Sequence, residues 1–582
     1  MDKRNHCPPD VNSINGFCSK TKIFHSLRPR VPLPPLTDHQ PLSVTDYGLS
    51  LLTTSASAAS STFIIDASSD DDQQLTFSQT LRLAGFLTLR LRARFSLSKG
   101  DVAFILVPPS INVPIIYLSL LSLGVVISPA NPLSSDSEIA HQVRISNPSI
   151  AFATSWTASK LLPKLRLGVV LVDSPEFDSV LTHYSDTGSA SFCSSSMPLL
   201  SNVNRVCPSD PATILYSSGT TGHVKGVLMT HRNLIALIAG RYHVEPKIDP
   251  GPVESELPQP RRRVCLFALP PFHAYGFLML IMAFVMGETL NIMRRFEFEA
   301  MLRAVEKYRA TRLLVSPPIV MNLVKSKITN KYDLSSLENA VCGGAPLDRK
   351  VSEQFRAKFP HVELMLGYAM TESGSVGSRM MGPYESRRYG SVGRLSENME
   401  AKIVDPVTGE ALPPGQKGEL WLRGPCIMKG YVGDDKATAE TINSDGWLKT
   451  GDLCYFDSEG FLFIVDRLKE LIKYKAYQVP PAELEHLLQS NPEIADAAVI
   501  PYPDDEAGQI PMAFVVRKAG SNITETQVID FIAKQLNFSL KVAPYKKIRR
   551  VAFVDNISKS PAGKILRRHL INLAVSGPKA RL

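Results

Sequence analysis

Hydrophobic positions along the chain switch between a helical and a strand period from about residue 75 onward. Leu81, Ala84 and Thr88 recur at the spacing of one helix face, and the apolar run at 102–107 is typical of a buried strand. Further short apolar runs predict strands at residues 169–172, 212–216 and 226–229. Alternation of this kind predicts an α/β fold built in layers.

The apolar stretch at 102–126 is long enough to suggest a membrane span. Pro108, Pro109 and Pro114 interrupt it, and proline breaks a helix because it has no N–H to donate. We therefore expect a buried strand, a loop and a helix here, and no transmembrane segment. The first six residues are polar and no apolar segment follows them, which predicts the absence of a secretory signal.

A change of pattern near Asp466 predicts a second, smaller domain. A basic loop is followed by a helix whose apolar face carries Leu484, Leu487 and Leu488, and then by two strands and another helix. These elements predict a compact α+β unit of ~115 residues, large enough to fold alone. We expect an N-terminal Pro/Ser-rich segment at 1–60, a large nucleotide-binding domain at 61–466 and a small mobile domain at 467–582.

Composition limits the classes of function. The 582 residues are 44% hydrophobic and 20% charged, which is ordinary for a globular enzyme. The net charge of +9 favours anionic ligands, but the basic residues are spread without a recognition-helix pattern, so we expect no nucleic-acid partner. The eight cysteines form no C-x-x-C pair, which argues against a metal cluster or a disulfide framework.

Two segments carry the chemistry, a hydroxyl- and glycine-rich loop at 217–226 and a lysine turn at 560–564. Glycines let backbone N–H groups turn toward an anion, hydroxyls donate to it, and Lys225 neutralises charge. The loop is not a Walker A motif, because Lys225 is followed by Gly226 instead of Ser or Thr. A surface turn is the alternative. A nucleotide bound by the first segment and attacked under the control of Lys564 would be the chemistry of carboxylate activation.

Several motifs in order give the chain a specific resemblance. They are Tyr216–Gly222 with Lys225-Gly226, Pro270–Gly276, Gly343–Leu347, Gly367–Ser373, Thr450–Leu453, Asp466–Glu470 and the Lys564 turn. Together they resemble the adenylate-forming superfamily of acyl-CoA synthetases, luciferases and adenylation domains. In particular, the chain resembles plant 4-coumarate:CoA ligase-like proteins of the peroxisomal type. The resemblance implies a large adenylate-forming domain of several subdomains and a small mobile lid domain.

The resemblance assigns ATP, Mg²⁺ and coenzyme A as cofactors. It gives Glu372 to the metal, Asp452 and Arg467 to the ribose, and Thr371 to the α-phosphate. The full nucleotide set that it implies is Ser217, Ser218, Gly219, Thr220, Thr221, Gly222, Lys225, Gly344, Ala345, Gly367, Tyr368, Thr371, Asp452, Arg467 and Lys564. Lys564 would bridge the α-phosphate and the attacking carboxylate, where two anions about 4 Å apart repel by ~4 kcal/mol at an effective dielectric of 20.

The same resemblance implies the acyl and CoA sites. Lys564, His273 and Lys469 are the expected catalytic residues, with His273 gating the acyl group and Lys469 acting as the hinge. The acyl set is His273, Tyr275, Met279, Gly343, Gly367, Val376, Gly377, Lys469 and Lys473, and the CoA set is Arg295, Lys475 and Ala476. Hydroxycinnamate ligases usually have Gly at position 476, and the methyl group of Ala476 restricts positive φ.

Each of these residues also has a structural interpretation. Asp452 could cap a turn, Glu372 could sit at a solvated helix start, and Lys564 could belong to a solvated basic face with Lys559 and Arg567. His273 between apolar neighbours could be a core histidine. The ordered set of motifs favours function over these alternatives.

Three features bear on the substrate and the compartment. The stretch 277–280 is apolar where hydroxycinnamate enzymes place a polar residue, and an unpaired phenol would cost roughly 1–3 kcal/mol on burial. Gly377 replaces a large side chain, which predicts a deeper cavity. The terminal Ala580-Arg581-Leu582 follows the pattern of the peroxisomal address, which predicts an import receptor as partner.

We therefore expect an ATP-dependent carboxylate:CoA ligase that acts through an acyl-adenylate. Its expected substrate is an apolar acid of the fatty, jasmonate-precursor or phenylpropanoid type. The alternatives are an adenylating enzyme with a non-CoA acceptor, a luciferase-like oxygenase, or a non-catalytic binder. The presence of Glu372, Asp452, Arg467 and Lys564 opposes the last of these.

Overall fold

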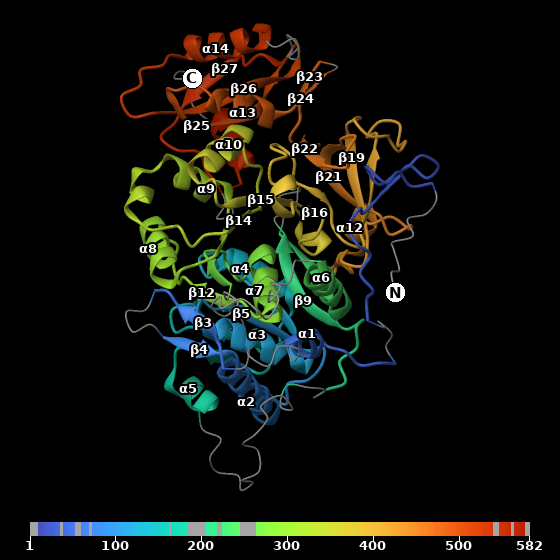
Figure 1. The fold of residues 1–582 in the computed structure, drawn as a ribbon, viewed down its shortest axis with the longest axis vertical. Coiled ribbons are helices and arrows are strands. Elements are labelled where there is room, and N and C mark those ends of the chain that lie inside the picture. Colours follow the sequence, from blue (N-terminus) through green and yellow to red (C-terminus); the bar gives the residue numbers. More distant parts are fainter. Residues whose placement is uncertain are drawn as a thin grey trace, which may run out of the picture.

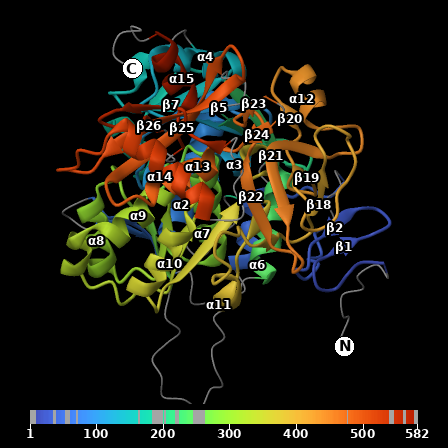
Figure 2. The same ribbon diagram turned by 90° about the horizontal axis from the view of Figure 1, so that it is seen from above.

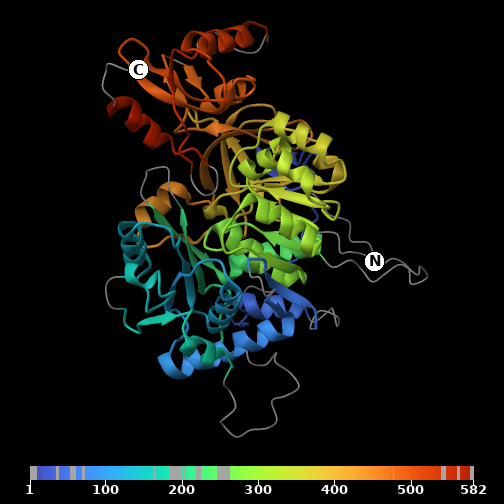
Figure 3. The ribbon, with the colours of Figure 1, turned by 90° about the vertical axis from the view of Figure 1, so that its left-hand side faces the viewer.

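The computed structural model describes residues 10–34, 39–52, 60–68, 73–161, 165–182, 200, 204–217, 224–244, 263–475, 477–538, 546–559 and 564–576. Three sheets with their helices make up the chain as far as Arg467, and a fourth sheet forms a separate C-terminal unit. That unit is drawn in red at the top of Figure 1, and Figure 3 shows it standing above the rest of the molecule.

The first sheet has seven strands and contains the predicted phosphate loop. Its strands, in spatial order, are β20 (Gly430–Tyr431), β10 (Lys225–Thr230), β9 (Pro211–Ser217), β6 (Val126–Pro129), β5 (Val102–Leu106), β7 (Ile150–Ala153) and β8 (Val169–Leu171). Strands β5 to β9 run parallel, whereas β10 pairs antiparallel with β9. Helix α2 (Phe77–Phe95) precedes β5, and the helices that follow strands of this sheet are α3 (Asn112–Leu123), α4 (Asp136–Ser146), α5 (Pro175–Thr182) and α6 (His231–Val244).

The second sheet has nine strands, of which the central ones are parallel. Their order is β17 (Arg394–Leu395), β16 (Ser378–Arg379), β15 (Glu363–Tyr368), β14 (Asn339–Cys342), β13 (Arg312–Val315), β11 (Val264–Phe267), β12 (Thr289–Ile292), β3 (Thr62–Asp66) and β4 (Gln74–Thr76). The associated helices are α1 (Val44–Leu52), α7 (Ala274–Met286), α8 (Phe298–Tyr308), α9 (Pro317–Lys325), α10 (Arg349–Lys358) and α11 (Gly382–Glu385).

The six-stranded antiparallel sheet brings the two ends of the large body together. Its order is β1 (Phe17–Cys18), β2 (Ile23–His25), β18 (Glu400–Val404), β19 (Gly418–Arg423), β21 (Leu448–Phe456) and β22 (Leu462–Arg467), and α12 (Asp435–Thr441) lies between β20 and β21 in the chain. Figure 2 shows β1 and β2, in blue, beside the orange strands. Part of the predicted N-terminal segment thus pairs with a sheet, while the boundaries at 60 and 466 stay predictions.

The C-terminal unit is a five-stranded sheet flanked by helices. It contains β23 (Ile472–Tyr474), β24 (Tyr477–Val479), β25 (Ile494–Asp504), β26 (Gly508–Arg517) and β27 (Arg550–Phe553), with α13 (Pro481–Gln489), α14 (Glu525–Phe538) and α15 (Arg567–Ser576). Leu484 and Leu488 are buried on the predicted face of α13. The two short strands predicted here are one long hairpin, β25–β26, because Tyr502 and Ile510 continue the pairing beyond the apolar core positions.

The apolar run at 102–126 forms β5, α3 and the start of β6, as predicted. Helix α3 ends at Leu123, and the next residue, Gly124, caps it. Its φ of +69° lies in the left-handed region, which residues with a side chain adopt only with strain. Helix α7 is apolar on every side because it packs within the main core together with α1 and α6. Across the described ranges, none of the helices is long and apolar enough to cross a membrane.

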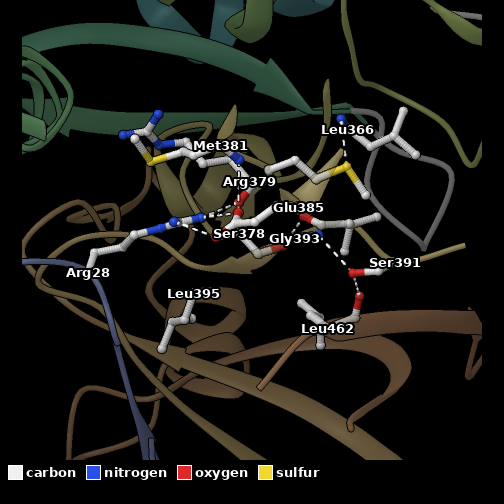
Figure 4. A network of polar contacts seen from close by, with 12 residues as sticks. Arg28, Leu366, Ser378, Arg379, Met381, Glu385, Ser391, Gly393, Leu395 and Leu462 are labelled. Atoms are coloured by element: carbon white, nitrogen blue, oxygen red, sulfur yellow. Dashed lines mark hydrogen bonds and ion pairs between the residues drawn. The ribbon is translucent and has the colours of Figure 1, made fainter. Parts of the chain in front are cut away.

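A buried polar network fixes the N-terminal arm to the second sheet. The guanidinium of Arg28 donates to both carboxylate oxygens of Glu385, at 2.7 and 2.6 Å, and to the carbonyl oxygen of Arg379 at 2.8 Å. The Arg379 guanidinium in turn donates to Glu397 at 2.8 Å. Figure 4 shows Arg28 reaching across to this cluster. The network therefore anchors β16, the strand that follows Val376 and Gly377.

Candidate active site

The predicted phosphate loop joins two antiparallel strands. Ser217 at the end of β9 lies opposite Lys225 at the start of β10, so the two strands hold the ends of the loop together. The Ser217 hydroxyl is buried and has no hydrogen-bond partner among the described residues, an arrangement that costs about 1–3 kcal/mol unless an acceptor binds. A phosphate oxygen would satisfy it. The predicted Ser218, Gly219, Thr220, Thr221 and Gly222 lie outside the described residues.

Lys225 and Glu372 meet through a tyrosine that the sequence analysis did not identify. The ammonium of Lys225 lies 4.6 Å from the centre of the Tyr431 ring, and the Tyr431 hydroxyl donates to Glu372 Oε1 at 2.9 Å. Glu372 is buried in a one-turn helix at Thr371–Ser373. Tyr431 therefore contacts the Lys225 ammonium with its ring and the Glu372 carboxylate with its hydroxyl. The sequence offered little indication of this role for Tyr431, because Gly430-Tyr431 belongs to none of the motifs that define the site.

The predicted ribose residues form a second connected group. Asp452 lies on β21 and Arg467 lies opposite it on β22. The Tyr368 hydroxyl donates to Asp452 Oδ2 at 2.6 Å, and Arg467 Nε lies 3.5 Å from Asp452 Oδ1. Burial raises the pKa of the Asp452 carboxyl, while the charge of Arg467 and the hydrogen bond from Tyr368 act against that rise. Asp452 is thus a strand residue that accepts hydrogen bonds, instead of a turn cap.

Parallel strands bring the two glycine motifs together. β14 and β15 are neighbours in the sheet, so Gly343 to Ala345 and Gly367 to Tyr368 leave it at the same edge. Gly344 has a φ of +89°, which favours glycine. Thr371 follows directly in the turn that carries Glu372. This edge of the sheet therefore gathers the nucleotide residues predicted from two separate motifs.

Lys564 belongs to the C-terminal unit but faces the large body. Burial and the charge of Arg467 lower the pKa of the Lys564 ammonium to about 8, while Glu470, Asp452 and Glu372 act in the opposite direction. Asp452 and Glu372, which belong to the large body, thus act on the charge of Lys564. The side chain of Lys564 is half-buried, which is less solvent exposure than a solvated basic face would give it.

His273 is the cap residue before α7 and lies close to the same lysine. Its ring is solvent-accessible, yet surrounding protein atoms lower its pKa by desolvation, and the charge of Lys564 lowers the pKa further. A solvated side chain in such surroundings is expected at the wall of a recess, not in a core. Gly276 makes the turn possible, because a Cβ there would lie 2.0 Å from the carbonyl oxygen of Pro270.

Two predicted acyl residues have defined surroundings on this side. The Tyr275 hydroxyl donates to the carbonyl oxygen of Val341 at 3.1 Å, and a Cβ added at Gly343 would touch the Tyr275 ring. Met279 is buried one turn further along α7. These contacts bring the predicted acyl residues of two motifs against each other.

Gly377 has a different role from the one expected. A Cβ at this position would lie 2.6 Å from the carbonyl oxygen of Tyr368 and 3.0 Å from its ring. The space beside Gly377 is therefore filled by Tyr368, and the glycine allows β15 and β16 to approach closely instead of opening a cavity. Val376 lies partly buried against the main core.

The predicted hinge and CoA residues that the structure describes have exposed side chains. Lys469 and Lys473 are exposed, and Lys475 pairs with Glu506 at 3.0 Å. Lys475 has a φ of +52° in the tight turn between β23 and β24, and Ala476 lies outside the described residues. Arg295 is exposed just after β12, beside Arg294, which pairs with Asp66 at 2.7 Å.

A buried cluster behind Lys564 was not identified as a group from the sequence. Arg567, three residues after Lys564, lies 3.0 Å from Glu485 and 2.9 Å from Glu470. Burial raises the pKa of Glu485 to about 7 and that of Asp466 to about 6, and Arg567 acts against both shifts. The sequence feature that could have indicated this cluster is the position of Arg567, three residues after Lys564. The cluster links the lysine turn to the segment that carries the predicted hinge.

The donor set suits a nucleotide with Mg²⁺. Ser217, Lys225 and Lys564 supply hydroxyl and ammonium groups for phosphates, and Asp452 supplies an acceptor-only carboxylate for ribose hydroxyls. No group of three or more metal-ligating side chains occurs within the described ranges. A single carboxylate such as Glu372 suits Mg²⁺, which keeps waters and phosphate oxygens as its other ligands.

Comparisons with known proteins agree with this geometry. A family model described as AMP-binding enzyme matches residues 53–432, and one described as AMP-binding enzyme C-terminal domain matches residues 483–564. Among solved structures, ATP-bound MatB from Rhodopseudomonas palustris has a TM-score of 0.75 at 24% identity, over 91% of this chain and 99% of that chain. The amide bond synthetase McbA from Marinactinospora thermotolerans has a TM-score of 0.76 at 23% identity, with the same coverage. These structures show the fold.

Curated relatives match at higher identity. The Arabidopsis thaliana protein named 4-coumarate--CoA ligase-like 9 is 55% identical over 98% of each chain. The Arabidopsis thaliana protein named Peroxisomal OPC-8:0-CoA ligase 1 is 46% identical over 98% of this chain and 99% of its own. The chain therefore belongs to the AMP-binding enzymes and, within them, to the acid–thiol ligases related to 4-coumarate:CoA ligase.

Proposed function

We propose that this enzyme joins an apolar carboxylic acid to coenzyme A in two steps, through an acyl-adenylate. The observation that carries the proposal is the position of Lys564, which comes from the small unit and acts electrostatically on His273, Asp452 and Glu372 of the large body. A cation at this point offsets the repulsion between the attacking carboxylate and the α-phosphate.

In the first step the acid attacks the α-phosphate of ATP and pyrophosphate leaves. Ser217 and Lys225 would bind the β- and γ-phosphates. Asp452 would accept hydrogen bonds from the ribose hydroxyls, and Arg467 would position the ribose. Mg²⁺ on Glu372 would neutralise phosphate charge. Tyr368 supports this step because its hydrogen bond orients Asp452.

In the second step the thiol of CoA attacks the acyl carbon and AMP leaves. We propose that the small domain rotates about Lys469, removes Lys564 and brings Lys473 and Lys475 to the site. This rotation is supported by the exposure of Lys473 on the same unit that carries Lys564. Both lysines cannot occupy the site at once if that unit moves as one body.

The proposed acid is longer and more apolar than 4-coumarate. The residues at 277–280 are all buried and apolar, so a phenolic hydroxyl there would lack a partner from these side chains. The relative named Peroxisomal OPC-8:0-CoA ligase 1 supports a jasmonate precursor as one candidate. We also propose a peroxisomal location from residues 580–582, which lie outside the described residues.

The test measures pyrophosphate release, AMP formation and CoA consumption with a panel of carboxylic acids. We expect the highest kcat/KM for medium- or long-chain fatty acids or cyclopentenone-bearing acids. A preference for 4-coumarate would overturn the proposed substrate class. Acyl-adenylate that forms without consumption of CoA would overturn the second step.

A further inference from the structure

Helix α4 contacts both strands that carry the ends of the predicted phosphate loop. Its buried residues Ile139 and Val143 belong to an apolar cluster against which Tyr216, the next-to-last residue of β9, packs. A Cβ added at Gly226, the second residue of β10, would lie 2.8 Å from the Ile145 side chain, so α4 also reaches β10. One helix therefore supports the strand before the loop and the strand after it.

The strand before the loop is attached to α4 by a phenol. The Tyr216 hydroxyl donates to the backbone carbonyl oxygen of Gln142 at 3.0 Å, and it lies 2.6 Å from the hydroxyl of Ser128 on β6. Burial raises the pKa of Tyr216 to about 12, so the phenol keeps the proton that it shares with the carbonyl oxygen. The next residue along the chain is Ser217, whose hydroxyl is a predicted phosphate ligand.

The strand after the loop is attached to α4 by the neighbouring residue of the same helix. Nε2 of His141 lies 3.0 Å from the carbonyl oxygen of Val224. Since a carbonyl oxygen only accepts hydrogen bonds, Nε2 carries a proton and donates. Val224 directly precedes Lys225, whose ammonium lies 4.6 Å from the centre of the Tyr431 ring. The hydrogen bond from His141 therefore fixes the backbone at the point where Lys225 begins β10.

Helix α4 is capped at both ends, which makes it a firm support. The Ser135 hydroxyl accepts from the backbone N–H of Glu138, and the Glu138 carboxylate accepts from the backbone N–H of Ser135 at 2.8 Å. At the other end, Asn147 has a φ of +44° and its N–H donates to the carbonyl oxygen of Val143 at 2.8 Å. Consecutive residues of a capped helix hold a constant separation, so the two attachment points are fixed relative to each other.

We propose that α4 sets the separation of the phosphate-binding groups and that His141 is a positioning residue for Lys225. This inference rests on the proposed function, in which Ser217 and Lys225 bind the β- and γ-phosphates. Those phosphates occur in ATP and pyrophosphate, whereas AMP and an acyl-adenylate lack them. Loss of the His141 hydrogen bond therefore weakens the binding of ATP and pyrophosphate and leaves the binding of AMP unchanged.

The test measures the Kd of Mg²⁺-ATP and of AMP by calorimetry with the full-length enzyme. His141→Met removes the N–H donor and keeps an unbranched side chain that suits a helix. We expect the Kd for ATP to rise about fivefold, the size of one net hydrogen bond of about 1 kcal/mol, with the Kd for AMP unchanged. His141→Gln retains an N–H donor and should recover most of the affinity for ATP. Arg144→Met, at an exposed position of the same helix, is the matched control and should change neither Kd.

Tyr216→Phe tests the second attachment independently, because it removes a single hydroxyl. It should also weaken ATP more than AMP, and it keeps the inference testable even where His141→Met does not fold. The same selectivity should appear in the reaction. In both variants the KM for pyrophosphate in the reversal of adenylation should rise, while thioester formation from supplied acyl-adenylate keeps its rate.

The outcomes separate this inference from the proposed function. An unchanged Kd for ATP in both variants would overturn the inference. Equal losses of affinity for ATP and AMP would overturn it as well, since a general loosening of the fold produces that result. An effect in Tyr216→Phe alone would remove His141 from the positioning of Lys225. Failure of the wild-type enzyme to bind ATP would overturn the proposed function itself.

Discussion

Replacing Arg567 with Met tests whether the buried cluster behind Lys564 stabilises the C-terminal unit. Arg567 makes two contacts of 3.0 Å with the carboxylate of Glu485 and one of 2.9 Å with Glu470. Glu485 is 5% exposed and also accepts from the backbone N–H of Val499 at 2.7 Å. The substitution keeps most of the side-chain volume but leaves Glu485 without its guanidinium partner.

The expected cost follows from distance and burial. Two unit charges 3.0 Å apart attract by about 5 kcal/mol at an effective dielectric of 20. Removing one partner of a buried pair costs about 3–5 kcal/mol when the other stays charged. Glu485 can reduce this cost by taking up a proton, since burial already raises its pKa to about 7.

The sign of the pH dependence is fixed by that shift. The native state binds a proton at Glu485 more readily than the unfolded chain does, so this carboxyl makes the free energy of unfolding fall as pH rises from about 4.5 to about 7. Without Arg567 the pKa rises further and the fall extends above pH 7. We expect Arg567→Met to cost about 3 kcal/mol at pH 8 and clearly less at pH 6.

The assay is hydrogen exchange of the α13 and β25 amides between pH 6 and pH 8, corrected for the intrinsic exchange rate. Arg568→Met, at an exposed neighbouring position, is the matched control and should change nothing. Adding Glu485→Gln to Arg567→Met should recover most of the lost protection. Unchanged protection in Arg567→Met, or no recovery in the double variant, would refute the role given to the cluster.

Three further predictions concern the site itself. Lys564→Ala should slow adenylation by ~10²–10³ but spare thioester formation from supplied acyl-adenylate. Adenylation by the wild-type enzyme should decline as pH rises through about 8, because the ammonium of Lys564 loses its charge there. Equal losses in both half-reactions would contradict the assignment. Tyr368→Phe should raise the KM for ATP several-fold with a smaller change in kcat, because Asp452 loses one hydrogen bond of about 1 kcal/mol; an unchanged KM would argue against it. Gly377→Ala should lower stability by about 1–3 kcal/mol in urea unfolding, because its Cβ meets the carbonyl oxygen of Tyr368; wild-type stability would show that this strand contact relaxes freely.

The sequence predicted the elements that local pattern determines. The strands around 102–107, 212–216 and 226–229 form where they were expected, because each is a short apolar run bounded by turn residues. Leu484 and Leu488 are buried because their spacing of four residues places them on one face of α13. Family motifs located Asp452, Tyr368 and Lys564, and the fold brings them together.

Long-range partnerships could not be read from the chain. Tyr431 reaches Glu372 across 59 residues, and Arg567 reaches Glu485 across 82 residues. Pairing of this kind depends on how sheets stack, which local periodicity does not encode. The role of Gly377 was missed for a related reason, since a missing side chain can mean open space or close backbone approach.

The Arg28 network has a practical consequence for anyone who shortens this protein. A version that starts after residue 30 would lose β1, β2 and the guanidinium that neutralises Glu385, while Glu385 itself stayed buried at the end of α11. Such a fragment would expose the edge of β18 and invite unwanted pairing between molecules. Expression vectors should therefore keep the opening segment, and purification tags belong ahead of it.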